Sequence, residues 1–394
     1  MSHIVSFRIE GLAGRQEPFE MTMNRHVNVL FGLNGCGKTS LLKILHSAMR
    51  NDASLLIRVP FTSASVTIYS VTYAKNFTRT TTKTKPTVLT SPEIQEPSEV
   101  RIDDSVSLRF LHRDVQKLRW QTTPADKGAS ETAWKHQYLP TSRLLTGGIA
   151  MSRALSASGP ERLFFSEEQI DAYFAESIKN LWINYTSNLL SRIRKAQDAG
   201  LASILKAVLS PERRLSRKRT IELDSHQAYE SMKKFVTRQG SPRLLSQETD
   251  FEKRYDADRT LRRVVLDIDK IEKEIEQESS PRRQLEDLVA NLFSGGKTTK
   301  FTDQSIEIKA ASGVNIGLDS LSSGEKHLLM LLVDTLLAEE NSMIIDEPEI
   351  SMHVDWQRSL INIMTALNPE AQLIVATHSP EIMADIQDEF IKRM

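Results

Sequence analysis

The chain has 394 residues, of which 40% are hydrophobic and 26% charged, and its 51 basic side chains balance its 51 acidic ones. This length allows one large α/β domain with an insertion or two domains of ordinary size. Because the charges balance, the net charge of the protein does not attract it to nucleic acid, and any nucleic-acid surface would have to be a local patch. The single cysteine, Cys36, excludes an internal disulfide and fits a reducing compartment, so we expect a cytoplasmic protein.

The N-terminal third is predicted to be rich in strands. Residues 1–31 alternate apolar and polar positions and end in a short apolar run at 27–31 that is typical of a buried strand. A helix is expected at 39–49, where leucines recur at helical spacing. Residues 55–140 are rich in Thr, Val and Ser with scattered prolines, which predicts hairpins and loops, and 78–87 is expected to be an exposed hairpin tip.

The middle of the chain changes character. Residues 161–293 are rich in Leu, Ile, Lys, Arg and Glu and show helical periodicity, with a heptad seam of only about two heptads at Val264, Ile268, Ile271 and Ile275. This pattern predicts a helical hairpin rather than a long arm. Apolar strands return at 343–345 and 373–376, and the longest apolar stretch, 328–333, is far shorter than the roughly 20 residues of a membrane span.

A glycine-rich turn separates the predicted strand at 27–31 from the following helix. Residues 32–39, GLNGCGKT, match the pattern G-x-x-x-x-G-K-[ST], which wraps a phosphate with backbone N–H groups at a helix N-terminus. We expect Lys38 to reach the β- and γ-phosphates of ATP and Thr39 to hold Mg²⁺. A chance match is the alternative, which the strand–turn–helix context disfavours. The predicted nucleotide-binding residues of this loop are Gly32, Asn34, Gly35, Cys36, Gly37, Lys38, Thr39 and Ser40.

A second segment, SMIIDEP at 342–348, is an apolar strand that ends in two acids. Asp346 at the strand tip can hold Mg²⁺, and Glu347 is placed to polarise an attacking water. Taken alone, such a run is equally the end of a strand that leaves the core. Paired with GLNGCGKT, it predicts a Mg²⁺-dependent ATPase in which Lys38 and Glu347 are catalytic.

Three further segments resemble a known family. LSSGEKH at 321–327 is similar to the signature segment of ABC-type ATPases, DEPEISMH at 346–353 to their Walker B segment and D-loop, and ATHSPEI at 376–382 to their switch-histidine segment. Their order and spacing resemble the group of the SMC, Rad50 and RecF proteins. The closest resemblance is to stand-alone ATPases related to the OLD (overcoming lysogenisation defect) family, of the AAA_15 and AAA_21 type, in bacterial anti-phage defence systems.

This resemblance implies composite sites between two copies that meet head to tail. Ser323, Gly324 and Glu325 would lie at the start of a helix beginning at Glu325 and bind the γ-phosphate of ATP held by the other copy. His378 would contact the γ-phosphate from its own copy as a further catalytic residue; otherwise it caps a helix or is a buried structural histidine. The D-loop lacks the aspartate that is common in transporters.

The glutamine of the Q-loop has no clear position in the sequence. Gln137 is the candidate, and it would join Thr39 and Asp346 as a metal ligand; otherwise it is an ordinary strand residue. LPTSRL at 139–144 resembles a segment that the OLD-related ATPases carry before their helical insertion.

We therefore predict an α/β fold, namely an ABC-type P-loop ATPase core with a mixed central sheet and a β-rich subdomain, split by a helical insertion. The expected domains are an N-terminal lobe at 1–150, a helical insertion at 151–296 that forms a helical hairpin or a short coiled coil, and a C-terminal lobe at 297–394. The expected cofactors are ATP and Mg²⁺.

The expected role is that of a sensor or scaffold that forms a homodimer or a higher homo-oligomer and controls a separate effector. The chain stops at Met394, directly after the switch segment, so we expect no C-terminal nuclease domain of the OLD kind and an effector, a nuclease or a toxin, encoded nearby. We expect no membrane partner, and a nucleic-acid partner is left open.

Three other functions are possible alternatives for this sequence. A DNA-repair or chromosome-structure ATPase would use a basic cluster as its DNA contact, although a solvated helix face explains the same residues. A transporter ATPase is disfavoured because the insertion before the signature segment is far longer than transport requires. A module that only binds ATP is disfavoured because Lys38, Asp346 and Glu347 are all present. The basic cluster consists of Arg213, Arg214, Arg217, Lys218 and Arg219.

Overall fold

The fold comes from a computed structural model that describes residues 2–83, 118–125, 128, 132–141, 166–209, 223–238, 240, 243, 245, 247–293 and 296–394. The chain divides into two compact units, one formed by Met1–Ile178 with Ile316–Met394 and the other by Lys179–Asn315. Helices and several sheets alternate along it, so the predicted α/β fold class is confirmed. The basic cluster at 213–219 lies outside the described residues.

The first unit contains a five-stranded sheet in the order β13-β3-β12-β11-β7. All of its strand pairs are parallel, so the carboxyl ends of the strands meet at one edge. β11 and β12 are buried along their whole length, as expected for continuous apolar runs in a parallel sheet. The strands are β3 (Val27–Phe31), β7 (His136–Leu139), β11 (Ser342–Asp346), β12 (Gln372–Thr377) and β13 (Ile391–Arg393).

The antiparallel strands of this unit form a separate sheet in the order β2-β1-β4-β5-β6. Helix α1 (Lys38–Arg50) contributes Leu41 and Leu45 to one hydrophobic core that also contains residues of both sheets, such as Val66 and Ile374. This shared core fixes α1 at the carboxyl edge of the parallel sheet. The antiparallel strands are β1 (His3–Glu10), β2 (Phe19–Thr22), β4 (Ser63–Ser70), β5 (Lys75–Thr82) and β6 (Gln121–Thr123).

The exposed hairpin tip expected at 78–87 is wrong for its described part. Residues 78–82 belong to β5, which pairs with β4 on one side and with β6 on the other. Alternating β-branched threonines suit a strand with two neighbours. The turn between β4 and β5 lies earlier, before Lys75, where Ala74 has a positive φ of 50°.

Two helices complete the C-terminal part of the first unit. α9 (Ser323–Leu337) packs against α10 (Val354–Leu367), and almost all of α9 is buried. Such a helix is hydrophobic on nearly all sides because it lies inside the protein rather than on its surface. Short 3₁₀ helices are η1 (Leu12–Gly14), η2 (Ala53–Leu56), η4 (Leu318–Ser320), η5 (Pro380–Met383) and η6 (Asp388–Phe390).

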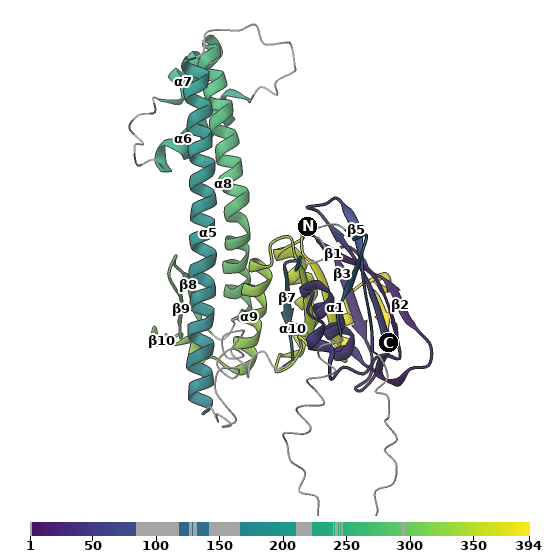
Figure 1. Cartoon of the computed structure of the whole chain (residues 1–394). Coiled ribbons are helices and arrows are strands. Elements are labelled where there is room, and N and C mark those ends of the chain that lie inside the picture. Colours follow the sequence, from purple (N-terminus) through teal and green to yellow (C-terminus); the bar gives the residue numbers. More distant parts are fainter. Residues whose placement is uncertain are drawn as a thin grey trace, which may run out of the picture. The chain divides into compact units, whose positions relative to one another are not determined.

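The second unit is dominated by two long helices that run side by side, α5 (Glu167–Leu209), which begins in the first unit, and α8 (Arg259–Leu292) (Figure 1). α5 has 43 residues, so at a rise of 1.5 Å per residue it is about 65 Å long. The expectation that the insertion forms no long helical arm is therefore wrong. The buried seam of α8 continues beyond Ile275 to Leu285 and Val289, past a charged stretch that hides it in the sequence.

Two shorter helices, α6 (Ser225–Arg238) and α7 (Glu248–Ala257), pack against α8 and form a small core of their own. A three-stranded sheet in the order β10-β9-β8 completes the second unit. Its strands are β8 (Thr298–Phe301), β9 (Ile306–Lys309) and β10 (Asn315–Ile316). In the part of the chain that the structure describes, no helix is both long and apolar enough to cross a membrane.

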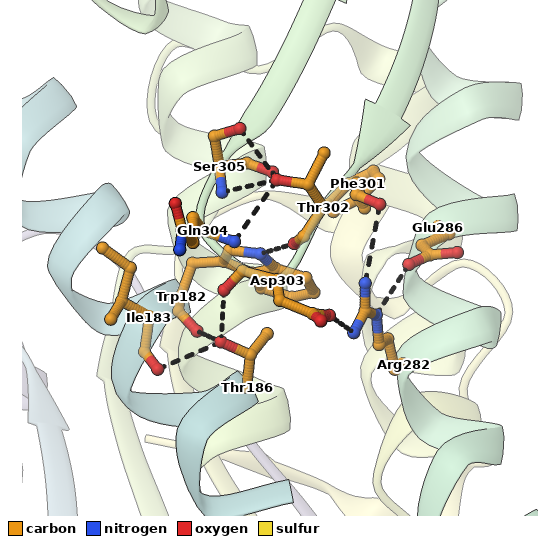
Figure 2. Close-up of polar contacts among 10 residues, drawn as sticks. All are labelled: Trp182, Ile183, Thr186, Arg282, Glu286, Phe301, Thr302, Asp303, Gln304 and Ser305. Atoms are coloured by element: carbon orange, nitrogen blue, oxygen red, sulfur yellow. Dashed lines mark hydrogen bonds and ion pairs between the residues drawn. The ribbon is translucent and has the colours of Figure 1, made fainter. Parts of the chain in front are cut away.

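The turn between β8 and β9 is clamped between the two long helices (Figure 2). From α5, Trp182 Nε1 donates to Thr302 O over 2.7 Å, and Thr186 Oγ1 donates to Asp303 O over 2.6 Å. From α8, Arg282 Nη1 donates to Asp303 Oδ1 over 2.6 Å. One hairpin turn thus joins the two helices through three charged or polar side chains.

Candidate active site

A glycine-rich loop joins β3 to α1 at the carboxyl edge of the parallel sheet. β3 is buried, and the chain turns as soon as the strand ends at Phe31. Gly37, the N-cap of α1, has φ +101°, and a Cβ at this position would lie 3.0 Å from the Ala13 Cβ. Glycine takes this left-handed conformation without strain. The loop therefore leads directly into a helix N-terminus, where N–H groups favour an anion.

Lys38 is the first residue of α1 and folds its side chain back over the loop. Its Nζ donates to Gly32 O over 2.7 Å and to Leu33 O over 3.2 Å, and the residue is 5% exposed. The ammonium group is thus held inside the loop by backbone carbonyls. Asn34 and Gly35 are exposed.

Arg15 adds positive charge to the rim of this loop, and the sequence analysis did not include it. Its Nη2 donates to Cys36 O over 3.4 Å, and its guanidinium lies 5.0 Å from the centre of the Phe19 ring. No short motif links Arg15 to the loop, because the two meet only after β1 and β2 have formed. It is a further residue that can face a bound phosphate.

The most direct link between the two predicted motifs is a hydrogen bond from Thr39 to Asp346. Thr39 Oγ1, in the first turn of α1, donates to Asp346 Oδ2, at the end of β11, over 2.8 Å. Asp346 is 1% exposed. A hydroxyl and a carboxylate are oxygen ligands of the kind that Mg²⁺ prefers. The donor set and the burial of the carboxylate therefore fit a magnesium ion.

Glu347 and His378 lie at the same edge, one strand apart. β11 and β12 are parallel with Asp346 opposite Ala376, so the residues that follow each strand are neighbours. The Glu347 N–H donates to Ala376 O over 2.8 Å, and His378 Nδ1 lies 3.2 Å from Glu347 Oε1. Glu347 has a positive φ of 48°, which is uncommon and strained for a residue with a side chain. The strained backbone aims this carboxylate at the sheet edge.

Glu349 is a site residue that the sequence analysis missed. It is 5% exposed, and its Oε1 accepts hydrogen bonds from Thr377 Oγ1 at 2.6 Å and from the N–H groups of His378 and Ser379 at 3.2 and 3.3 Å. The sequence DEPE at 346–349 already indicated such a role, because a third acid so close to a buried strand must find hydrogen-bond donors when the segment folds inward.

The signature segment begins α9, but not where the sequence analysis expected. The helix starts at Ser323, two residues before the predicted start at Glu325, and Ser322 is its N-cap. The Glu325 carboxylate accepts from Ser322 N over 3.0 Å and from Ser322 Oγ over 2.9 Å. This reciprocal capping box occupies the Glu325 side chain within its own helix. Ser323 is exposed at the helix N-terminus.

Gly324, near the start of α9, lies too close to a neighbouring loop to carry a side chain. A Cβ at Gly324 would lie 2.5 Å from Ser351 O, in the loop that follows β11. His327, one turn further along α9, contacts the same loop through Nδ1 and Ile350 O at 2.5 Å. The start of α9 is therefore packed directly against the loop after Asp346 and Glu347.

Gln137 is not brought to the candidate magnesium site, which corrects its assignment as a metal ligand. Gln137 lies opposite Met343 in the pairing of β7 with β11, so three residues, or roughly 10 Å of strand, separate its level from that of Asp346. β7 ends at Leu139, opposite Ile345, and the exposed Thr141 follows two residues later. Only the register of the two strands reveals this.

A cavity of about 480 Å³ lies beside α1. Ser40, Lys43 and His46 line it from one face of α1, and Tyr138 lines it from β7.

Two residues of this cavity have shifted pKa values. His46 stacks on Tyr138, and burial and the neighbouring His136 lower the pKa of His46 to about 3. Burial, together with the charge of Asp346, raises the pKa of Tyr138. His46 is therefore neutral at physiological pH, and Tyr138 keeps its proton.

A comparison with protein families shows to which family the chain belongs. Residues 27–384 match the model of AAA_21, an AAA domain family that includes a candidate AbiEii toxin of a type IV TA system. The chain belongs to this family. The predicted resemblance to the AAA_21 type is therefore confirmed.

Two curated relatives of this AAA_21 chain are retron proteins. It is 30% identical over 94 residues to the "Retron Vc95 probable ATPase" of Vibrio cholerae, a match that covers 21% of this chain and 18% of that protein. It is 27% identical over 121 residues to the "Retron Ec83 probable ATPase" of Escherichia coli, with 27% and 22% covered. The chain thus spans about a fifth of the length of these relatives.

Solved structures similar to this AAA_21 chain include heads of Smc proteins. The Smc head domain of Pyrococcus furiosus bound to the C-terminal domain of ScpA matches with a TM-score of 0.44 at 12% identity, covering 98% of this chain and 92% of that one. The head domain from Thermotoga maritima matches with a TM-score of 0.39 at 10% identity, covering 99% and 94%.

Proposed function

We propose that this chain binds ATP with Mg²⁺ and hydrolyses it at a site shared by two copies, and that this cycle controls a separate effector in an anti-phage defence system. The observation that carries the proposal is the meeting of Thr39, Asp346, Glu347 and His378 at one edge of the parallel sheet. A phosphate loop, a metal-binding pair and a water-polarising carboxylate are the recurring parts of phosphoryl transfer.

The proposed phosphate site uses the loop N–H groups, the N-terminus of α1 and Lys38. When ATP enters, Lys38 Nζ would exchange its bonds to Gly32 O and Leu33 O for bonds to phosphate oxygens. Thr39 and Asp346 would hold Mg²⁺, which supplies charge neutralisation at the phosphates. The buried Asp346 carboxylate gains a cation close to it, which offsets the cost of its burial.

Hydrolysis requires a base that orients water, and Glu347 is proposed for this role. Its backbone is fixed by the N–H bond to Ala376 O, so its side chain starts from a defined point at the sheet edge. Its carboxylate would take a proton from the water as the water oxygen bonds to the γ-phosphorus and the bond from that phosphorus to the bridging oxygen breaks, which releases ADP. His378, whose ring lies beside Glu347, would contact the γ-phosphate from the same copy.

The second copy would contribute the signature segment. Ser323 is exposed at the N-terminus of α9, where a helix offers N–H groups and partial positive charge to an anion. Gly324 lies so close to Ser351 O that a side chain would be excluded, which keeps this helix end bare. These features support a head-to-tail dimer in which each ATP lies between two copies.

The names of the relatives support the defence role. The family description includes a toxin of a toxin–antitoxin system, and both curated relatives are retron ATPases. We propose that the effector is a separate nuclease or toxin and that ATP-driven assembly controls it. The lone cysteine Cys36 fits a reducing compartment, so the proposed location is the cytoplasm.

The central test is ATP turnover by the purified chain with Mg²⁺ and with a chelator. Glu347→Gln should lower kcat by about 100-fold or more and keep ATP binding, because it removes only the base. Lys38→Ala should abolish ATP binding. Glu370→Gln, a change at an exposed glutamate, is the matched control and should hydrolyse ATP like the wild type.

Three results would count against the proposal. Normal turnover by Glu347→Gln would contradict the catalytic assignment, and a monomeric mass in light scattering both with and without ATP would contradict the dimer. DNA-stimulated turnover that falls steeply with salt would instead favour a DNA-repair ATPase.

A further inference from the structure

The Glu349 carboxylate lies at the centre of a hydrogen-bond network that spans two loops. Its Oε1 accepts from the hydroxyl of Thr377, the last residue of β12, and from the N–H groups of His378 and Ser379, which follow it. A carboxylate that accepts several N–H and O–H bonds fixes the backbone that supplies them. Because Thr377 is fully buried and Glu349 nearly so, water does not compete strongly for these bonds.

The same carboxylate also faces the imidazole of His378. His378 Nδ1 lies 3.4 Å from Glu349 Oε1 and 3.2 Å from Glu347 Oε1. One N–H group makes one strong hydrogen bond, so the two carboxylates compete for this nitrogen. If Glu347 turns to water, Glu349 is the acceptor that can keep Nδ1, and the ring then stays oriented with Nε2 directed away from both.

Glu349 also belongs to the loop that contacts the signature helix. The next residue, Ile350, presents its carbonyl to His327 Nδ1, and Ser351 O lies against Gly324. A second connection runs parallel to the first, because Ser379 Oγ donates to Gln357 Oε1 and Gln357 Nε2 donates to Met352 O. The switch segment and the loop beneath the signature helix are therefore joined at two points.

We infer that Glu349 is a positioning residue that holds the switch segment and accepts the Nδ1–H of His378, so that Glu347 is free to orient the attacking water. This inference rests on the proposed ATPase function. Glu349 does not touch the nucleotide; it acts through His378. The bonds to Thr377 and Ser379 make the ring position independent of whether Glu347 is engaged with water.

Glu349→Gln is the sharpest test, because the amide oxygen can still accept the bonds of the switch segment while the negative charge is lost. We expect kcat to fall by about 30-fold and the KM for ATP to change by less than about threefold. Glu370→Gln is again the matched control, and thermal melting reports whether each variant is folded. If Glu349 had only a structural role, the substitution would lower the melting temperature and would not lower kcat selectively while leaving the KM for ATP nearly unchanged.

A double-mutant cycle separates action through His378 from any independent effect. In a His378→Ala background, Glu349→Gln should lower kcat by less than about twofold, because the group it serves is already gone. An equal fall in both backgrounds, or no fall in the wild-type background, would overturn the inference while leaving the ATPase function intact. Absence of turnover in the wild type would overturn both.

If Glu349→Gln does not fold, Glu349→Asp in the same two backgrounds decides the question. This variant keeps the negative charge, but its side chain is one methylene shorter, so the carboxylate lies further from the His378 ring. We expect a fall in kcat of about tenfold with His378 present and none with His378→Ala. Equal values for Glu349→Asp and wild type would contradict the inference.

Discussion

The hydroxyl of Thr39 lies 2.8 Å from Asp346 Oδ2, although 307 residues separate them in the chain. The contact exists because β3, which leads into the phosphate loop, and β11, which ends at Asp346, are both neighbours of β12. The sheet itself therefore brings together the two oxygen atoms that we propose as ligands of Mg²⁺.

Thr39→Val should weaken Mg²⁺ binding. Valine has nearly the shape of threonine and lacks the hydroxyl, so the site loses one oxygen ligand, and the Mg²⁺ concentration for half-maximal turnover should rise by roughly tenfold or more. Thr39→Ser keeps the hydroxyl and should stay within about threefold of the wild type. A Mg²⁺ titration of ATP turnover checks this, and an unchanged midpoint for Thr39→Val would show that Thr39 is not a ligand.

Mixing two inactive variants should restore activity if the sites are composite. Lys38→Ala removes the phosphate grip of its own copy, and Ser323→Arg blocks the signature end that serves the other copy. A mixed dimer has one site with both changes and one site with neither, so an equal mixture should recover about a quarter of wild-type turnover. Each variant alone, measured at the same total concentration, is the control. No recovery on mixing would argue that each copy hydrolyses ATP by itself.

Arg79→Met should destabilise the first unit strongly. Arg79 is fully buried, donates to Ala48 O and Thr132 O, and stacks 3.9 Å above the centre of the Trp134 ring. Burial lowers its pKa to about 10, so it stays charged at neutral pH. Removing the guanidinium takes a charged donor from Ala48 O, at the end of α1, and another from Thr132 O, which should lower the free energy of unfolding measured with urea by about 2–4 kcal/mol.

The control for this change is Arg8→Met on the surface of the antiparallel sheet. Arg8 pairs with Glu20 at 2.8 Å, but the two side chains are 53% and 63% exposed. Exposed pairs contribute little, so the loss should stay below about 1 kcal/mol. Similar losses for the two variants would mean that Arg79 does not stabilise α1.

His46 should make the protein sensitive to acid. Burial first, and the neighbouring His136 second, lower the pKa of His46 to about 3, whereas a histidine in the unfolded chain titrates near 6.5. Between these values the unfolded state binds a proton that the folded state does not. Stability should therefore fall as the pH drops below about 6.5, with a slope of up to about 1.4 kcal/mol per pH unit.

His46→Asn isolates this contribution. His136 Nδ1 lies 2.8 Å from Trp134 O, so His136 Nε2 is the acceptor for His46 Nδ1 at 2.7 Å, and an asparagine amide can replace that donor. Urea unfolding at about pH 7 and about pH 5 should show a smaller acid loss for His46→Asn than for the wild type. The same change at His26, an exposed histidine, is the control. Parallel pH dependence of His46→Asn and wild type would refute the assignment.

Short-range patterns predicted the parts of the site that a few consecutive residues determine. The apolar run of β3, the glycine-rich turn and the start of α1 follow one another directly, so the phosphate loop was predictable from the sequence. The start of α9 was also encoded, since Ser322 and Glu325 have the spacing of a capping box, but the resemblance drew attention to the wrong helix start.

Other parts depend on contacts that no local pattern contains. The register of β7 against β11 decides that Gln137 lies level with Met343 and not with Asp346. The role of Glu349 depends on the meeting of two loops after β11 and β12. The length of α5 was hidden because its distal half exposes leucines such as Leu201 and Leu205 rather than showing a clean apolar stripe.

The strand order of the parallel sheet has a consequence for how the protein is made. β3 lies between β12 and β13, and 345 residues separate Asn28 from Leu373 on the neighbouring strand. At ribosomal speeds of 5–20 residues per second, β3 waits roughly 20 to 70 s for its partners. During that time both edges of the apolar strand β3 are unpaired, so the strand can pair with other chains and aggregate. Nascent chains of this protein should therefore depend on chaperones until the last strands emerge.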